Sequence, residues 1–282
     1  MADSVTEITV PSPDLQALAL ELMTARSSGA PIAVPPSARV PGFDLPAAYV
    51  AEAELARMRR ASGHVPVGYK VGFASKAVWR VLGLDTVVWA HMYDDTVYHA
   101  AENAAALTLE RMCSAKIEPE IVFTMKESLG ENAFDAAEVL EAVESIALGF
   151  EIIDCPYPDW KFQPADFVAS FGLHAALVVG EPRSVHAGLI PTLVDQLARF
   201  KVRLMKNGQL VSEGSGRNVL RSPALCLGEL ASAMSRHPLA QPLARGDLVS
   251  SGTLTDSQPI AAGETWTATV EGIDLPELTL RT

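Results

Sequence analysis

The stretch 117-IEPEIVF-123 decides how the rest of the sequence is interpreted. Ile117, Ile121 and Phe123 fall on odd positions, whereas Glu118 and Glu120 fall on even positions. Because successive side chains of a β-strand point to opposite faces, this alternation predicts a strand that carries both carboxylates on one face. Adjacent carboxylates repel each other unless water solvates them or a cation bridges them. On this stretch alone, a strand with a solvated outer face and a cation site are both open.

A third carboxylate favours the cation site. Glu151 lies between the apolar segments 146-IALGF-150, interpreted as the end of a helix, and 152-II-153. An acidic residue inside so apolar a run is expected to be buried, and a buried carboxylate needs a partner. Three carboxylates without suitably spaced His or Cys ligands favour a hard cation such as Mg²⁺ or Mn²⁺. Asp154 is interpreted either as a residue that orients a ligand or as a capping or surface residue.

From Val67 onward, short β-prone runs dominate the sequence. These runs are 67-VGYKVGF-73, 117-IEPEIVF-123, 174-HAALVVG-180, 200-FKVRLMKNG-208, 247-DLVSSGTLT-255 and 265-TWTATVEG-272. Between them the sequence predicts helices over 135–149, 189–199 and 223–236. Because these helices do not alternate regularly with the strands, a doubly wound sheet or a (β/α)8 barrel is disfavoured and an α+β fold is predicted.

The beginning of the chain has a different character. Helical spacing of apolar residues predicts a helix over 13–28, a Pro-rich passage follows over 31–46, and an Ala-, Glu- and Arg-rich segment predicts a second helix over 47–61. We therefore predict a helical N-terminal extension over 1–66, containing a Pro-rich linker, and a β-rich catalytic domain over 67–282.

Composition excludes several classes of protein. The 282 residues are 49% hydrophobic and carry a formal net charge of −12, which disfavours binding to nucleic acid or to anionic lipid. Three cysteines in no metal-binding pattern give neither a disulfide framework nor a Cys-type zinc site. The sequence shows no secretory signal segment and no uninterrupted apolar run of membrane-spanning length. We expect a cytoplasmic protein.

Two further features are candidates for a site. Lys70 lies between Gly68 and Gly72, where a strand would place it on the same face as both glycines, and such a lysine suits a proton carrier, an anion anchor or an edge-strand charge. The turns 213-EGSG-216 and 250-SSGTLT-255 offer backbone N–H groups that suit the lining of a pocket.

Together these pieces resemble the fumarylacetoacetate hydrolase superfamily, and within it the branch of 2-keto-4-pentenoate hydratases and 4-oxalocrotonate decarboxylases. The resemblance spans about 47–272. It is carried by Gly68-Tyr69-Lys70-Val71-Gly72 with Ser75-Lys76 and Leu82-Gly83, by Glu118-Pro119-Glu120, by Glu151-Ile152-Ile153-Asp154 with Asp159-Trp160, by Asn207-Gly208, and by Gly246-Asp247 with Ser251-Gly252-Thr253.

The resemblance implies a mixed β-sheet roll and Mg²⁺ or Mn²⁺ held by Glu118, Glu120 and Glu151. In that family the ion chelates the carboxylate and the 2-oxygen of a 2-hydroxy-2,4-dienoate, so Lewis-acid polarisation stabilises an enolate. Lys70 is then an active-site residue that moves protons or holds negative charge, while Gly252 and Thr253 bind substrate. The resemblance also implies a homo-oligomer, and it is compatible with association with a related decarboxylase or hydratase.

The sequence departs from the hydratase pattern at three places, one of which is Pro156, where an Arg is usual. Val88 stands where the hydratases usually have an acidic residue, and 169-ASFGLHA-175 replaces their Ala-Asp-Asn-Ala-Ser segment. Ser170 and Phe171 are therefore candidate substrate-binding residues of a differently built wall. His174 is a candidate catalytic acid or base because the pKa of histidine lies near neutrality, although a structural histidine at the start of a strand is common.

Several functions fit this pattern. The leading interpretation is a metal-dependent hydratase that adds water to a 2-hydroxy-2,4-dienoic acid in aromatic or related ring catabolism. The alternatives are a decarboxylase of a 2-oxo-dienedioate of the 4-oxalocrotonate type and a C–C hydrolase of an acylpyruvate-like acid, for which only His174 is an obvious base. A catalytically lapsed binding or assembly subunit is a further alternative, which the departure at Val88 motivates.

Overall fold

The computed structural model describes residues 14–129 and 135–282, so the first thirteen residues of the predicted N-terminal extension lie outside the described part of the chain. Its helices are α1 (Leu15–Ser28), α2 (Pro36–Arg39), α3 (Leu45–Ala61), α4 (Lys76–Leu82), α5 (Ala136–Glu141), α6 (Pro164–Ala169), α7 (Ile190–Arg199) and α8 (Pro223–Ser235), with short 3-10 segments η1 (Pro158–Trp160), η2 (Phe171–Leu173) and η3 (Gly216–Asn218).

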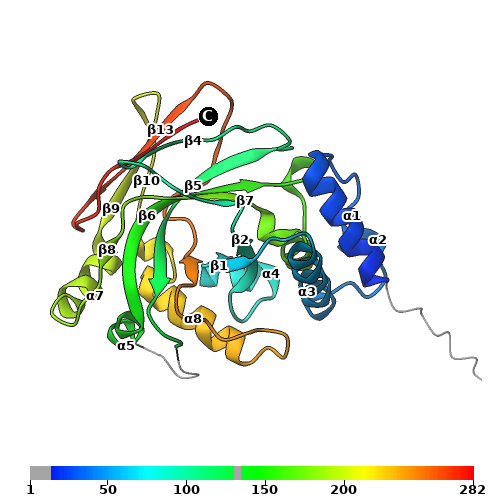
Figure 1. The fold of residues 1–282 in the computed structure, drawn as a ribbon, viewed down its shortest axis with the longest axis horizontal. Coiled ribbons are helices and arrows are strands. Elements are labelled where there is room, and N and C mark those ends of the chain that lie inside the picture. The colour runs from blue at the N-terminus through cyan, green and yellow to red at the C-terminus, as the bar shows by residue number, and fades with distance from the viewer. Residues whose placement is uncertain (1–13, 130–134) are drawn as a thin grey trace, which may run out of the picture.

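The strands form two sheets (Figure 1). They are β1 (Pro66–Gly72), β2 (Val88–Tyr93), β3 (Val97–His99), β4 (Ala104–Ala106), β5 (Ala115–Met125), β6 (Val143–Asp154), β7 (His174–Val179), β8 (Arg183–Ser184), β9 (Lys201–Lys206), β10 (Gln209–Ser215), β11 (Leu248–Ser250), β12 (Gln258–Pro259), β13 (Thr265–Glu271) and β14 (Leu278–Arg281). This mixture of sheets and helices confirms the predicted α+β class.

The larger sheet carries the candidate site. Its main path runs β2-β1-β11-β5-β6-β7-β3, and β12 and β8 pair with β5 and β6 beside that path. The β1–β11 and β3–β7 pairs are parallel, whereas β5–β6 and β6–β7 are antiparallel. The smaller sheet has the order β10-β9-β13-β14-β4. The two long strands β5 and β6 therefore lie at the centre of the larger sheet, with neighbours on both edges.

The helix predicted over 135–149 is wrong for most of its length. A capping box at Asp135 starts α5, but this helix ends at Glu141, and β6 begins two residues later. β6 pairs with β5 on one edge and with β7 on the other, and it is buried on both faces. A strand buried on both faces has a continuous apolar sequence, which periodicity does not separate from a buried helix.

The N-terminal helices share a core with the sheet. The predictions over 13–28 and 47–61 are confirmed as α1 and α3, and Asp14 caps α1 by accepting a hydrogen bond from the Ala17 N–H at 3.0 Å. α3 contacts both α1 and α6, and buried Leu22 and Leu55 belong to the same hydrophobic cluster as Phe150. These helices lie together at one end of the molecule in Figure 1. The domain boundary at 66/67 stays a prediction.

Three helices pack together elsewhere in the fold. α7 and α8 confirm the helices predicted over 189–199 and 223–236, and they contact each other and α5 (Figure 1). Pro223 occupies the first turn of α8, where its missing N–H costs nothing. Within residues 14–129 and 135–282, no helix has the length and apolar character needed to cross a membrane.

Candidate metal centre

The register of the two central strands brings three carboxylates together. Glu118 of β5 lies directly opposite Glu151 of β6, and Glu120 lies opposite Gly149, so all three acidic side chains share one face of the sheet. One ligand oxygen from each carboxylate lies within 4.8 Å of the others. The predicted common face of Glu118 and Glu120 is therefore also the face of Glu151. The pairing of β5 with β6 brings Glu151 there, and the sequence alone did not show that pairing.

Burial makes these carboxylates difficult to ionise together. Glu151 is fully buried, Glu120 is 1% exposed and Glu118 is partly exposed. Burial raises the pKa of Glu118 to about 8, with Lys70 opposing the shift and Glu120 adding to it. Burial also raises the pKa of Glu120 to about 8, and the charge of Glu151 reinforces it. The centre would gain most from a cation, because a cation offsets both the desolvation and the mutual repulsion.

The two oxygens of Glu120 have different surroundings. Its Oε2 accepts hydrogen bonds from the Ser250 hydroxyl and, at 2.8 Å, from the Gly252 N–H. Its Oε1 is buried and accepts no hydrogen bond from a described residue, and the Glu120 and Glu151 carboxyl groups lie close enough to share a proton. A buried acceptor without a donor is costly, and an oxygen-binding cation would satisfy it. Gly252 has φ +104°, where a side chain is strained, and its Cβ would lie 2.8 Å from that of Ala74.

Lys70 supplies the positive charge nearest the three carboxylates. Its Nζ lies 2.9 Å from Glu151 Oε2 and 5.1 Å from the centre of the Phe167 ring. Burial lowers the pKa of Lys70, but the attraction of Glu151 and Glu118 outweighs it, so the pKa is raised and the side chain is an ammonium.

Lys70 and Glu151 meet across two intervening strands. β11 and β5 separate β1 from β6 in the larger sheet. Lys70 pairs with Ser250 of β11, and Ser250 pairs with Val122 of β5, so Lys70 lies on the sheet face that also carries Glu120. The two long side chains therefore extend toward each other over that face.

His174 contacts the Glu151 carboxylate. Its Nδ1 is 3.0 Å from Glu151 Oε1 and its Nε2 is 3.0 Å from the Thr96 hydroxyl. Burial, reinforced by the charges of Arg26 and Lys70, holds the pKa of His174 well below its usual value, so the ring is neutral. In a neutral ring one nitrogen donates a hydrogen bond and the other accepts one, and the Thr96 hydroxyl itself donates to the Tyr93 carbonyl at 3.0 Å. Both ring nitrogens are thus occupied by protein groups.

The other predicted wall residues contact groups outside the three carboxylates. The Ser170 hydroxyl bonds that of Tyr157, and the Arg26 guanidinium lies 4.6 Å above the centre of the Phe171 ring. Ser170 and Phe171 line a cavity of about 170 Å³ beside α1. Thr253 donates its hydroxyl proton to the Thr255 carbonyl at 2.7 Å. Of the predicted substrate-binding residues, Gly252 alone has a described hydrogen bond to one of the three carboxylates.

Phe171 is also the first residue of an unusual turn. Phe171, Gly172 and Leu173 all have left-handed backbone angles, with φ between 56° and 62°. A Cβ on Gly172 would lie 2.9 Å from Lys70 Cδ and 2.9 Å from Ala90 Cβ. The turn therefore packs against the stem of Lys70 and fixes its direction. Strained backbone of this kind persists where the surrounding packing enforces it.

The sequence predictions missed three contributors to the site. Ser250 lies within the turn that had been identified, although its bond to Glu120 was not predicted. Thr96 reaches His174 across 78 residues, and Arg26 of α1 donates a hydrogen bond to the His174 carbonyl across 148 residues. No local sequence pattern indicates either long-range contact.

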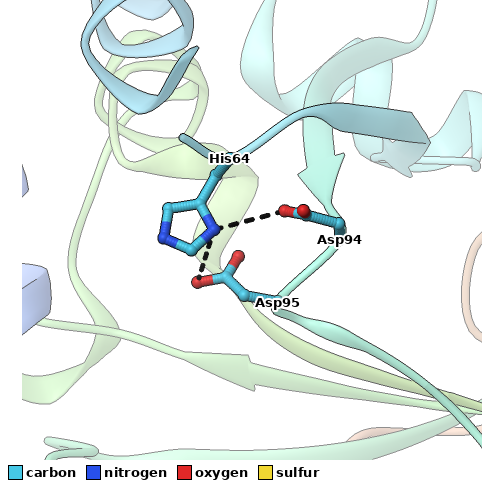
Figure 2. A group of neighbouring side chains, drawn as sticks. All are labelled: His64, Asp94 and Asp95. Carbon is cyan, nitrogen blue, oxygen red and sulfur yellow. Dashed lines mark hydrogen bonds and ion pairs between the residues drawn. The ribbon is translucent and has the colours of Figure 1, made fainter. Parts of the chain in front are cut away.

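A second group of potential ligands lies at the surface. Figure 2 shows that the Nδ1 atom of His64 faces both Asp94 and Asp95, at 3.3 and 3.6 Å. The side chains are 33% to 41% exposed, and Arg59 forms an ion pair with Asp95. Because Arg59 already balances one carboxylate and the histidine nitrogen is turned toward both acids, this group is an ion-pair network rather than a second metal centre.

The mixed sheet gathers two buried carboxylates, a partly exposed one and one ammonium. These features define a class of proteins suited to holding a divalent cation next to an organic acid. The chain belongs to the fumarylacetoacetate hydrolase family: the family described as fumarylacetoacetate (FAA) hydrolase C-terminal matches residues 88–280. This match confirms the resemblance found in the sequence.

Individual relatives are hydratases and a decarboxylase. The chain is 30% identical over 228 residues to a 2-hydroxyhexa-2,4-dienoate hydratase of Comamonas testosteroni, covering 80% of this chain and 82% of the relative. It is 26% identical to a 4-oxalocrotonate decarboxylase of Pseudomonas sp. strain CF600, covering 80% and 81%. A solved 4-oxalocrotonate decarboxylase from Pseudomonas putida G7, complexed with magnesium and adipate, has a TM-score of 0.85 at 24% identity over 97% of this chain and 98% of that chain. This last comparison shows the shared fold.

Proposed function

We propose that the protein is a metal-dependent hydratase of a 2-hydroxy-2,4-dienoic acid, with Mg²⁺ or Mn²⁺ held by Glu118, Glu120 and Glu151. The observation that carries the proposal is the Oε1 of Glu120, which lies buried beside two other carboxylates and accepts no hydrogen bond from a described residue. An all-oxygen donor set suits a hard divalent cation. The hydratases among the relatives support the choice of reaction.

The bound ion would supply Lewis-acid stabilisation of negative charge on the substrate's 2-oxygen. Lys70 is proposed either to balance the negative charge that forms on the substrate or to transfer a proton to or from the substrate. Its ammonium is suited to both roles because it lies beside the Glu151 carboxylate. Phe167 and the turn at Gly172 keep the lysine stem in one place. Gly252 and Ser250 orient Glu120 through its Oε2, so its Oε1 would be the oxygen available to hold the ion.

His174 is proposed to act through Glu151. Because both of its nitrogens contact protein groups, the ring has no free position from which to take a proton from a substrate or a water. This arrangement weakens the C–C hydrolase alternative, which needed His174 as a base. A positioning role predicts that His174→Gln, whose amide N–H can still donate to Glu151, retains more metal affinity than His174→Ala.

Decarboxylation of a 2-oxo-dienedioate is a second candidate. Val88 is 2% exposed and pairs with Gly72 in the sheet, so the position where hydratases usually carry an acid is apolar and closed. Adding water requires a group that positions it, whereas loss of carbon dioxide requires only stabilisation of the dienolate that remains. The decarboxylase among the relatives supports the same alternative.

One assay separates the candidates. A panel of 2-hydroxy-dienoates and 2-oxo-dienedioates is incubated with the purified protein, with and without Mg²⁺ or Mn²⁺. Loss of dienoate absorbance with formation of a 4-hydroxy-2-oxo acid supports the hydratase, and release of carbon dioxide supports the decarboxylase. Metal-dependent binding of oxalate without turnover of any panel member would instead favour a catalytically lapsed subunit.

The site itself is tested by substitution. Glu118→Gln should abolish metal-dependent turnover, and Glu127→Gln, at an exposed glutamate, is the matched control. Turnover that survives Glu118→Gln unchanged would refute the proposed ligand set. The homo-oligomer, the association with a related enzyme and the cytoplasmic location stay predictions.

A further inference from the structure

A basic groove of about 440 Å³ lies at the N-terminal end of α8. Three arginines line it, namely Arg199, Arg217 and Arg221, together with the apolar side chains of Val194 and Leu225. Such a cluster is unexpected in a chain whose formal net charge is −12, because most of its surface repels anions. The groove shares no lining residue with the three-carboxylate centre.

Among the described residues, a single acidic side chain lines the groove beside the three arginines. Arg199 pairs with Asp195 at 3.5 Å, and both side chains are exposed. Arg217 and Arg221 make no ion pair and no side-chain hydrogen bond with any residue in the described ranges, 14–129 and 135–282. Three arginines and one aspartate, Asp195, line the groove, so its described lining residues carry a formal charge of +2.

Ser222 adds an unused donor at the same place. It is the N-cap residue of α8, it is 2% exposed, and its hydroxyl is buried without a hydrogen-bond partner among the described residues. An N-cap serine normally accepts a hydrogen bond from the first turn, but no side chain caps this helix. The first-turn N–H groups of Ala224 and Leu225 therefore also have no side-chain acceptor.

We propose that this groove binds a phosphate monoester. Its dianionic head would accept hydrogen bonds from Ser222 and the first turn of α8, where the helix dipole also favours negative charge. Arg217 and Arg221 would balance that charge, since guanidinium groups match phosphate oxygens in geometry. The apolar wall at Val194 and Leu225 would contact the organic part of the ligand, which distinguishes a monoester from inorganic phosphate.

Calorimetric titration of the chelator-treated protein with phenyl phosphate, inorganic phosphate and benzoate tests this site. Removing metal keeps phosphate from binding through an ion at the three-carboxylate centre. We expect saturable binding at one site per chain, tightest for phenyl phosphate. Arg217→Gln and Arg221→Gln should each weaken it about tenfold or more, as expected for losing a charge-assisted hydrogen bond, and Ser222→Ala should weaken it about threefold or more.

Arg245→Gln is the matched control, because Arg245 is exposed, carries the same charge and does not line the groove. Its affinity should stay within about twofold of the parent, and thermal unfolding of every variant checks that the fold is retained. Absence of saturable binding, equal weakening by Arg245→Gln, or full affinity in Arg221→Gln would overturn the site. Equal affinity for benzoate or for inorganic phosphate would overturn the assignment to a phosphate monoester. These results do not depend on the reaction at the metal centre.

Discussion

Metal affinity at the three-carboxylate centre should rise steeply with pH. Burial raises the pKa of both Glu118 and Glu120 to about 8 in the metal-free protein. Near neutral pH these carboxyl groups therefore hold protons, and a cation must displace the protons in order to bind. Lys70 stays charged across the same range, because the pKa of its ammonium is raised rather than lowered.

The size of the effect follows from the ionised fraction of each carboxyl group. A group with a pKa near 8 is about one-eleventh ionised at pH 7 and about half ionised at pH 8. Apparent affinity scales with the product of these fractions when both groups must ionise. The dissociation constant for Mg²⁺ should then fall about 30-fold between pH 7 and pH 8, or about fivefold if only one of the two groups is protonated.

Calorimetric titration with Mg²⁺ or Mn²⁺ at pH 6, 7 and 8 measures this dependence directly. Repeating it in buffers of different ionisation enthalpy counts the protons released, which should be nearly two per ion at pH 7. Glu118→Gln should lower that number to about one, whereas Glu127→Gln should leave it unchanged. A dissociation constant that changes less than about twofold between pH 7 and pH 8, without proton release, would refute the electrostatic argument.

Three other properties should follow from the same geometry. The free energy of unfolding of the metal-free protein should fall as pH rises from about 5 to 8, because folded Glu118 and Glu120 retain protons that the unfolded chain releases near pH 4.5, and saturating Mg²⁺ should reduce this loss in thermal denaturation. Lys70→Met should lower kcat at least about 100-fold in steady-state assays with saturating metal, and a smaller loss would leave the lysine without a role in proton transfer. Gly172→Ala should lower the free energy of unfolding by about 1–3 kcal/mol more than Gly83→Ala in urea denaturation, since both glycines have φ near +65° but only the first would place a Cβ against Lys70 and Ala90. An equal decrease in the free energy of unfolding of both alanine variants would show that the turn at Gly172 does not pack tightly against Lys70.

Local sequence was sufficient to group Glu118 with Glu120, because a period of two is a property of one strand. It was also sufficient to predict burial of Glu151, because an acid in an apolar run needs a partner whether that run is a helix or a strand. The sequence did not show that Glu151 lies opposite Glu118, since register is decided by pairing between segments about 30 residues apart. The predicted helix over 135–149 failed for the same reason.

The surroundings of the carboxylates were harder to predict. One glycine in 169-ASFGLHA-175 suggests a turn, but it does not indicate that Phe171 and Leu173 also adopt left-handed angles. Those angles are imposed by tertiary packing, in which Arg26 approaches from α1 and Lys70 from β1. His174 was a candidate base because of its intrinsic pKa, and only the positions of Thr96 and Glu151 show that its nitrogens are occupied.

If the three carboxylates hold a divalent cation as proposed, the charge balance of the centre accounts for how an acidic protein would admit an acidic substrate. Three ionised carboxylates and one lysine ammonium sum to −2, and neutral His174 leaves that sum unchanged. A divalent cation brings the buried site to zero, whereas a monovalent cation would leave a net negative charge facing the substrate carboxylate. A protonated His174 would upset the same balance beside Glu151. The buried, neutral histidine and the charged lysine are therefore both required if the site is to select a divalent ion and then admit an anion.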